Sequence, residues 1–149
     1  MIPYGKQDID QSDIDAVINV LKSDWLTQGP QVPLFEQVLA DICQASYGVA
    51  VNSATSALHI ANLALGVGQG DIVWTSPITF VATANSALYC GAKIDFVDID
   101  LSSGNMSVAA LQAKLHWAKQ HNCLPKVVIP VHLAGQSCDM KAIHQLAKE

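Results

Sequence analysis

Residues 51–59 read Val51-Asn52-Ser53-Ala54-Thr55-Ser56-Ala57-Leu58-His59, and this stretch carries the most information about the fold. An apolar segment, Tyr47–Val51, precedes a cluster of small hydroxyl residues, and a helix-forming run follows from Ala57 to Leu65. A strand that enters a helix through Ser and Thr forms an anion site, because the first helical N–H groups lack intrahelical acceptors and the helix dipole adds positive charge. The cluster contains no Lys or Arg, so the expected ligand is a phosphate held by N–H and O–H donors. The plainer alternative is a Ser/Thr N-cap on an ordinary helix.

Length and composition limit the classes of protein that fit. The 149 residues are 50% hydrophobic, which is enough to bury one sizeable core and predicts a single domain. The net charge is −5 and the basic residues are scattered, so no nucleic-acid partner is expected. The N-terminus lacks a secretion signal, and polar residues interrupt the apolar stretches before membrane-spanning length. The four cysteines contain no C-x-x-C pair and are expected to remain thiols. We therefore expect a soluble, cytoplasmic protein with no membrane partner.

Helical and strand patterns alternate along the chain. Apolar residues at helical spacing predict a first helix near 13–22, after Ser12 as N-cap, and a second near 32–42 beyond a Gly29-Pro30 turn. The segments that follow alternate as strand 47–51, helix 56–65, strand 71–75, helix 79–90, strand 93–98, helix 107–121, strand 126–131 and helix 139–148. Four apolar strands separated by helices predict an α/β fold with an open, largely parallel sheet and helices on its faces.

The final helix ends at Glu149, where a further strand would be due in this alternation. A helix that packs on a sheet without a following strand leaves its α/β unit unfinished. We therefore expect the chain to be a fragment of a longer protein.

A second motif, Thr75-Ser76-Pro77-Ile78-Thr79-Phe80, also follows a predicted strand. It turns at Pro77 and is expected to start a helix with Thr79 as N-cap. Ligands of open α/β sheets bind at the carboxyl ends of the strands, so Phe80 would lie near the hydroxyl cluster. An aromatic ring beside a phosphate site can stack on a flat cofactor. The alternative is that Phe80 is a core residue.

Several ordered segments together resemble the DegT/DnrJ/EryC1 sugar aminotransferases. The segments that carry the resemblance are 3–6 (Pro-Tyr-Gly-Lys), 26–30 (Leu-Thr-Gln-Gly-Pro) with Phe35-Glu36, 52–59, 75–83, 98–100 and 130–136. Members of this family use pyridoxal 5′-phosphate (PLP) in the aspartate-aminotransferase fold. The resemblance implies that residues 1–149 form the N-terminal part of the large domain of that fold. An N-terminal arm and loop would span 1–45, and the α/β PLP-binding portion 46–149.

The resemblance also gives roles to individual residues. It implies that Ala54, Thr55 and Ser56 hold the PLP phosphate and that Phe80 stacks on the pyridine ring. The residues implied to contact a nucleotide-sugar are Tyr4, Asp24, Trp25, Leu26, Thr27 and Ala54. The loop and the 52–56 segment are most similar to the branch of the family that acts in pseudaminic acid biosynthesis. The implied reaction moves an amino group, with glutamate as donor, to a UDP-linked 4-keto-6-deoxy-N-acetylhexosamine.

The family's Schiff-base lysine and the acidic partner of the pyridine nitrogen are expected beyond Glu149. No catalytic residue is therefore expected among these residues, since Lys93, Lys114, Lys126 and Lys141 lack the motif context of that lysine. A full-length protein is expected to be a homodimer. The alternatives are another nucleotide-sugar aminotransferase of the family, a PLP-dependent sugar dehydratase, or a truncated, non-catalytic assembly module.

Two other site classes fit the sequence poorly. The glycine-rich segment 66–70 follows a helix and precedes a strand, the reverse of a dinucleotide-binding loop. His116 and His121 are five residues apart with no H-E-x-x-H pattern, so no metal site is expected.

Overall fold

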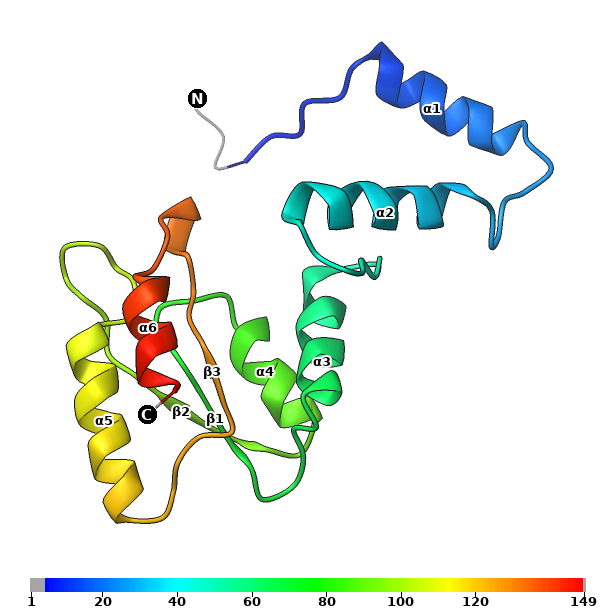
Figure 1. Cartoon of the computed structure of the whole chain (residues 1–149). Coiled ribbons are helices and arrows are strands. Elements are labelled where there is room, and N and C mark those ends of the chain that lie inside the picture. The colour runs from blue at the N-terminus through cyan, green and yellow to red at the C-terminus, as the bar shows by residue number, and fades with distance from the viewer. Residues whose placement is uncertain (1–4, 149) are drawn as a thin grey trace. The chain divides into compact units, whose positions relative to one another are not determined.

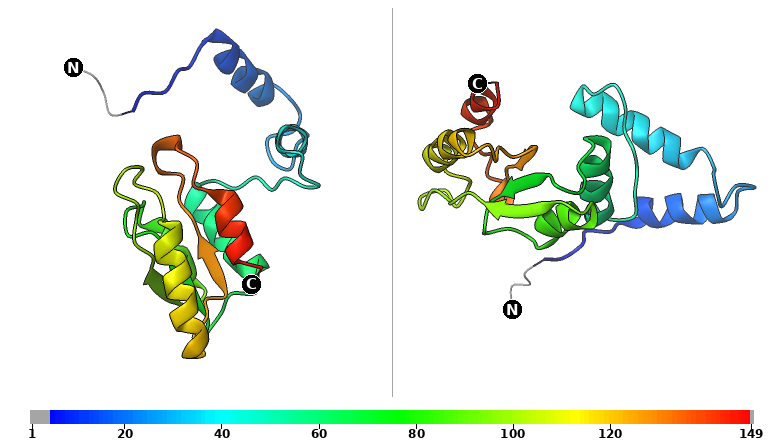
Figure 2. Two further views of the ribbon diagram at one scale, coloured as in Figure 1. Left: turned by 60° about the vertical axis from the view of Figure 1, so that its left-hand side comes forward. Right: turned by 90° about the horizontal axis from the view of Figure 1, so that it is seen from below.

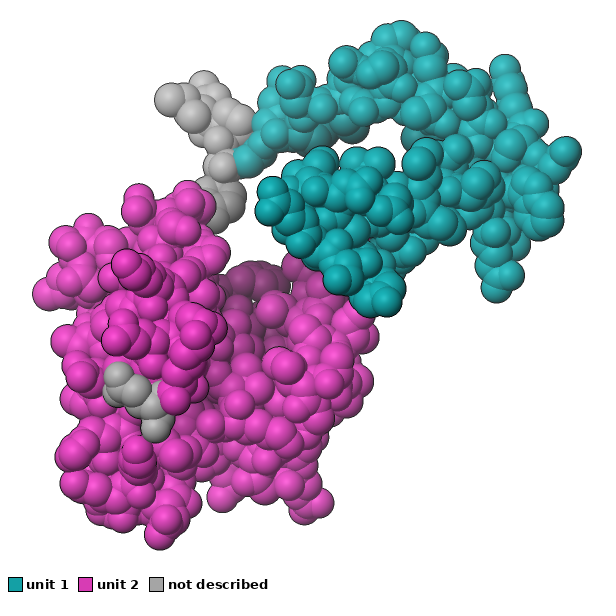
Figure 3. Space-filling model, viewed as in Figure 1, with its two compact units in different colours: residues 1–50 teal, residues 51–149 magenta. Residues whose placement is uncertain are grey.

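The computed structural model describes residues 5–148. These divide into two compact units, the first ending at residue 50 and the second beginning at residue 51 (Figure 3). The elements are α1 (Gln11–Leu21), α2 (Gln31–Cys43), α3 (Ala54–Ala64), β1 (Ile72–Thr75), α4 (Ala82–Tyr89), β2 (Lys93–Phe96), α5 (Val108–Gln120), β3 (Val127–Ile129), the 3-10 turn η1 (Leu133–Gly135) and α6 (Met140–Leu146). Apart from η1, each of these elements is a helix or strand predicted from the sequence, and its ends differ from the predicted ends by at most three residues.

The first unit contains α1 and α2. Asp10 is the N-cap of α1, and it forms a capping box in which its carboxylate accepts the Ser12 and Asp13 N–H groups. The predicted N-cap, Ser12, is wrong because its hydroxyl donates to the Asp10 carboxylate instead. Most apolar side chains of both helices are exposed, and Ala40 is the one residue of α1 and α2 that is buried.

The predicted strand Tyr47–Val51 is wrong: this segment has no regular secondary structure and pairs with no strand among residues 5–148. The Ala50 N–H donates to the Glu36 side chain of α2 at 2.8 Å rather than to a neighbouring strand. Gly48 lies so close to α2 that a Cβ there would meet the Glu36 carbonyl oxygen at 2.5 Å. The apolar segment therefore packs beside Glu36 of α2 instead of joining the sheet, and Tyr47 is 88% exposed.

The second unit is built on a parallel sheet in the order β2-β1-β3. Figures 1 and 2 show α3 and α4 on one face of this sheet and α5 and α6 on the other. Val73 and Ala87 belong to the core on the α4 side, and Trp74, Leu111 and Ile143 to the core on the α5/α6 side. The predicted open, parallel α/β arrangement is confirmed.

Local hydrogen bonding explains where the helices of this unit begin. Ser53, Ser107 and Asp139 cap α3, α5 and α6 through their side chains. Thr79 does not cap α4 as predicted. Its hydroxyl lies 2.9 Å from that of Thr83, and α4 starts after Val81.

The structure also describes the cysteines and the length of the helices. All four cysteines are free thiols. No helix in the described part of the chain is long and apolar enough to cross a membrane.

Candidate functional site

The hydroxyl cluster lies at the N-terminus of α3. Ser53 Oγ accepts the Ser56 N–H at 3.2 Å and lies 3.1 Å from Ser56 Oγ. Ser56 Oγ in turn donates to Asn52 Oδ1 at 2.7 Å. Ser53 is therefore the N-cap that sequence reasoning offered as the plainer explanation of this cluster.

The cap leaves several donors of this helix end unused. The Ala54 and Thr55 N–H groups and the Thr55 hydroxyl have no hydrogen-bond acceptor among residues 5–148. Two free amides and a hydroxyl at the positive end of an 11-residue helix suit a phosphate group, which accepts several hydrogen bonds. The Ser56 hydroxyl hydrogen is already used by Asn52, so Thr55 is the more available donor. The residues present therefore fit the phosphate of a cofactor.

The turn after β1 contributes an exposed aromatic ring. Thr75, the last residue of β1, donates through Oγ1 to the Ile129 carbonyl of β3 at 2.9 Å. Phe80, five residues further on, is 74% exposed. The alternative that Phe80 belongs to the core of this unit is therefore wrong, and its ring is open to a ligand.

The helix end and the strand ends lie at one edge of the unit. Because α3 leads into β1 and runs in the opposite direction, its N-terminus lies at the carboxyl edge of the parallel sheet, as Figure 1 shows. The loops after β1, β2 and β3 leave the sheet at that edge. This is the edge at which open α/β sheets bind ligands.

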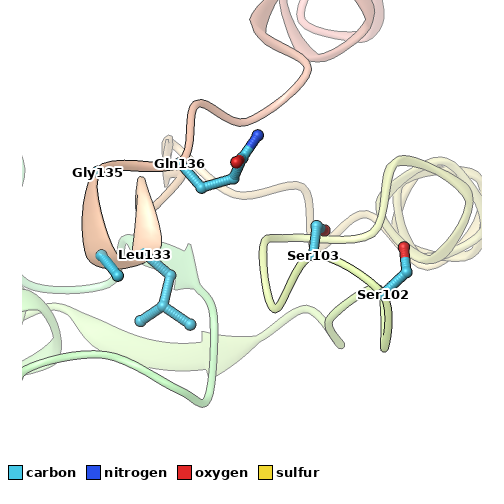
Figure 4. A pocket seen from close by; sticks show the side chains of 6 residues that line it. Ser102, Ser103, Leu133, Gly135 and Gln136 are labelled. Carbon is cyan, nitrogen blue, oxygen red and sulfur yellow. The ribbon is translucent and has the colours of Figure 1, made fainter.

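The loops after β2 and β3 border an open hollow at this edge (Figure 4). Its volume is about 650 Å³, and Ser102 and Ser103 line one wall while Leu133, Gly135 and Gln136 line the other. Asp100 accepts hydrogen bonds from the Ser102 hydroxyl and from the Ser103 N–H, which lower its pKa. The polar groups of the first wall are thus held by a carboxylate, and this wall suits neutral rather than anionic ligand groups.

Two lysines of the unit are engaged away from the hydroxyl cluster. Lys126 pairs with Asp71 at 2.9 Å and also donates to the Gly66 carbonyl, at the amino ends of β1 and β3. The hydrogen bond from Lys126 and that from the Gly68 N–H lower the pKa of Asp71. Lys114 pairs with Asp95 at 2.7 Å and lies over the Trp74 ring. Burial alone would raise the pKa of Asp95, but the hydrogen bonds from Lys114 and the Phe96 N–H lower it.

The predicted substrate-binding residues belong to the first unit or lie outside the described residues. Tyr4 is outside them. Asp24–Thr27 form the exposed connection between α1 and α2, in which Trp25 is 62% exposed. A Cβ on Gly29 would lie 3.0 Å from Trp25 Cβ, so Gly29 permits the tight return of the chain past this residue.

Sequence reasoning missed two asparagines at the carboxyl edge. Asn52 accepts the hydroxyls of Ser53 and Ser56, and Asn105 bonds three backbone groups of the turn after β3. Asn52 stands directly before the hydroxyl cluster, which was a usable signal. Asn105 had none, because its partners lie 28 or more residues away in sequence.

Comparison with known proteins gives a consistent result. Residues 7–149 match the model of the DegT/DnrJ/EryC1/StrS aminotransferase family. Over the whole chain, 44% of residues are identical to the UDP-4-amino-4,6-dideoxy-N-acetyl-β-L-altrosamine transaminase of Campylobacter jejuni, of which 38% is covered. Identity to the spore coat polysaccharide biosynthesis protein SpsC of Bacillus subtilis is 42%, over 99% of this chain and 36% of that protein.

Solved structures give the same match. Helicobacter pylori PseC, an aminotransferase involved in the biosynthesis of pseudoaminic acid, superposes with a TM-score of 0.87 and 34% identity over 98% of this chain and 38% of its own. The PLP form of a putative sugar aminotransferase from Streptococcus pneumoniae superposes with a TM-score of 0.85 and 32% identity, over 97% of this chain and 36% of its own. The chain thus spans less than two-fifths of the length of these relatives.

Proposed function

The chain belongs to the DegT/DnrJ/EryC1/StrS aminotransferase family. We therefore propose that the whole protein transfers an amino group to a UDP-linked sugar. The proposed acceptor is a UDP-linked 4-keto-6-deoxy-N-acetylhexosamine and the proposed donor is glutamate. The observation that carries the proposal is the set of free donors at the N-terminus of α3, in a chain 44% identical to the C. jejuni transaminase along its whole length.

PLP is the proposed cofactor. Ala54 and Thr55 would bind its phosphate through their N–H groups, and Thr55 and Ser56 through their hydroxyls. The exposed Phe80 would stack on its ring. When bound, PLP acts as an electron sink at the carbon that gains or loses the amino group.

The sugar nucleotide is proposed to contact Tyr4, the Asp24–Thr27 loop and Ala54. Trp25 and Leu26 are exposed in the described structure, so both side chains are free to meet a ligand. The whole protein is proposed to act as a homodimer.

Substitutions in the loop test the assignment of the sugar site. In the whole protein, Trp25→Ala or Thr27→Ala should raise KM for the UDP-linked keto-sugar by about tenfold while PLP affinity stays unchanged, because only substrate binding is lost. Steady-state kinetics with glutamate as donor, together with PLP titration, measure both quantities.

Trp117→Ala is the matched control, since Trp117 is 53% exposed on α5 and stacks on His121 in the second unit. KM should not change in this variant. Loss of PLP affinity in the Trp25 or Thr27 variants would place the loop at the cofactor, and a keto-sugar that receives no amino group from the wild-type protein would contradict the proposed reaction.

A further inference from the structure

The turn after β3 is fixed more firmly than a surface loop requires. Asn105 is 4% exposed, and its side chain donates to the Gln136 and Ser137 carbonyls at 3.0 and 3.1 Å. Its Oδ1 accepts the Leu133 N–H at 3.0 Å. The NH2 group and the carbonyl oxygen of the buried Asn105 amide thus both bond to the backbone of the turn after β3.

This turn also contains an unfavourable backbone conformation. Ala134 has a φ of 51° and a ψ of 28°, in the left-handed region that costs a non-glycine residue about 1–2 kcal/mol. Such conformations persist where surrounding contacts determine them, and they cluster at binding sites. The clamp by Asn105 supplies those contacts.

The first residue of the turn, His132, is held in one tautomer. Its Nδ1 lies 3.1 Å from the Cys138 backbone nitrogen, which donates to it, and Cys138 Sγ donates to the Val131 carbonyl beside it. A neutral imidazole that accepts at Nδ1 carries its hydrogen on Nε2. His132 is exposed, and its Nε2–H has no acceptor within residues 5–148.

Strand register brings the turn that contains His132 to the same edge of the sheet as the proposed cofactor site. Thr75 pairs with Ile129, so residues 130–132 leave the sheet next to residues 76–78, the start of the turn that carries Phe80. The hydroxyl cluster lies at the same edge of the unit.

We propose that His132 is a further binding residue of this site, which donates Nε2–H to an oxygen atom of the ligand, and that Asn105 is a positioning residue for it. The inference rests on the proposed function. The accepting oxygen belongs either to PLP or to the sugar nucleotide, and the test separates the two sources.

The test uses two substitutions of His132 in the whole protein. His132→Asn keeps an acceptor near the position of Nδ1 for the Cys138 N–H but removes the outer donor, whereas His132→Gln places an amide N–H near the position of Nε2. His132→Asn should weaken binding of one ligand by about tenfold, and His132→Gln should recover part of it. A raised Kd for PLP identifies the cofactor as the acceptor, and a raised KM for the UDP-linked keto-sugar identifies the substrate.

The positioning role of Asn105 is tested by coupling. Asn105→Asp removes the two N–H donors at nearly constant volume, so it should impair the same ligand as His132→Asn. The double variant should lose less than the product of the two single effects, because both changes act through one imidazole. His116→Asn is the matched control on α5, where His116 is exposed and bonds only to Gln120 among the described residues.

Imidazole ¹⁵N resonances of the wild-type protein provide a measurement that needs no variant. The His132 Nε2–H resonance should shift when the accepting ligand is added, while Nδ1 stays unprotonated. Wild-type affinities for both ligands in His132→Asn, or an Nε2–H resonance that moves with neither, would overturn the inference. Failure of the wild-type protein to bind PLP would instead contradict the proposed function.

Discussion

At the residue scale, one short segment combines a helix cap with unused hydrogen-bond donors. Ser53 caps α3, and the two residues after it keep their N–H groups free. Capping and anion binding therefore do not exclude each other here, although the sequence presented them as alternatives. Thr55 is the more available of the two hydroxyl donors, because Ser56 Oγ already donates to Asn52 whereas the Thr55 hydroxyl has no such partner in the described chain.

Phe80 allows the proposed stacking to be separated from packing. Phe80→Ala should change the free energy of unfolding of the apoprotein by less than about 0.5 kcal/mol, because the ring is exposed. PLP affinity should fall by about 0.5–1.5 kcal/mol through loss of the aromatic contact. Urea unfolding and PLP titration measure the two effects, and a large loss of apoprotein stability would make Phe80 a structural residue.

Thr75 and Ser76 are adjacent buried hydroxyl residues, and removal of their hydroxyl groups should affect stability differently. Thr75→Val removes the hydrogen bond to Ile129 and should destabilise the apoprotein by about 0.5–1.5 kcal/mol. Ser76 is 1% exposed and its Oγ has no partner in the described structure, so Ser76→Ala should leave stability unchanged or raise it. Chemical unfolding of both variants checks the signs. Equal destabilisation by both would mean that Ser76 has a partner.

At the element scale, most predicted elements are correct because their signals are local. The periodic apolar residues of α2 and α5 and the short apolar runs of β1 and β3 match the observed elements. The strand predicted at Tyr47–Val51 is wrong because a short apolar run does not specify its partner, and here the Ala50 N–H bonds to the Glu36 side chain. The Asn105 clamp depends on tertiary contacts that no sequence spacing reports.

The amino ends of the strands give a prediction about pH. Asp71 has a lowered pKa in the folded state through Lys126 and the Gly68 N–H. The stabilisation from this carboxylate is therefore complete above its unfolded pKa of about 3.9 and is lost as the pH falls through the lower folded value. Asp71→Asn should reduce the acid dependence of the unfolding free energy below about pH 4. The matched control is Asp8→Asn, at an exposed residue with no ion pair among residues 5–148. An unchanged slope in Asp71→Asn would contradict this role.

At the scale of the whole molecule, several unused hydrogen-bond donors of the second unit share one edge of the sheet. The ion pair between Lys126 and Asp71 lies at the opposite edge. The N-terminus of α3, the turn with Phe80 and the turn with His132 share the carboxyl edge. The alternating pattern predicted this edge, because parallel strands bring their carboxyl ends together. The sequence does not show which hydroxyl and amide groups bond to each other. The donors that remain free at this edge could therefore be identified only from the structure.

The most direct test of the account is PLP binding by the whole apoprotein and by its Thr55→Ala plus Ser56→Ala variant. The double substitution should weaken binding by about 2–4 kcal/mol, roughly 30- to 900-fold in Kd, and Thr55→Ala alone should account for the larger part. Ser107→Ala removes the equivalent cap of α5 and should leave the Kd unchanged. Wild-type PLP affinity in the double variant would contradict the account and leave the α3 cluster with only its capping role.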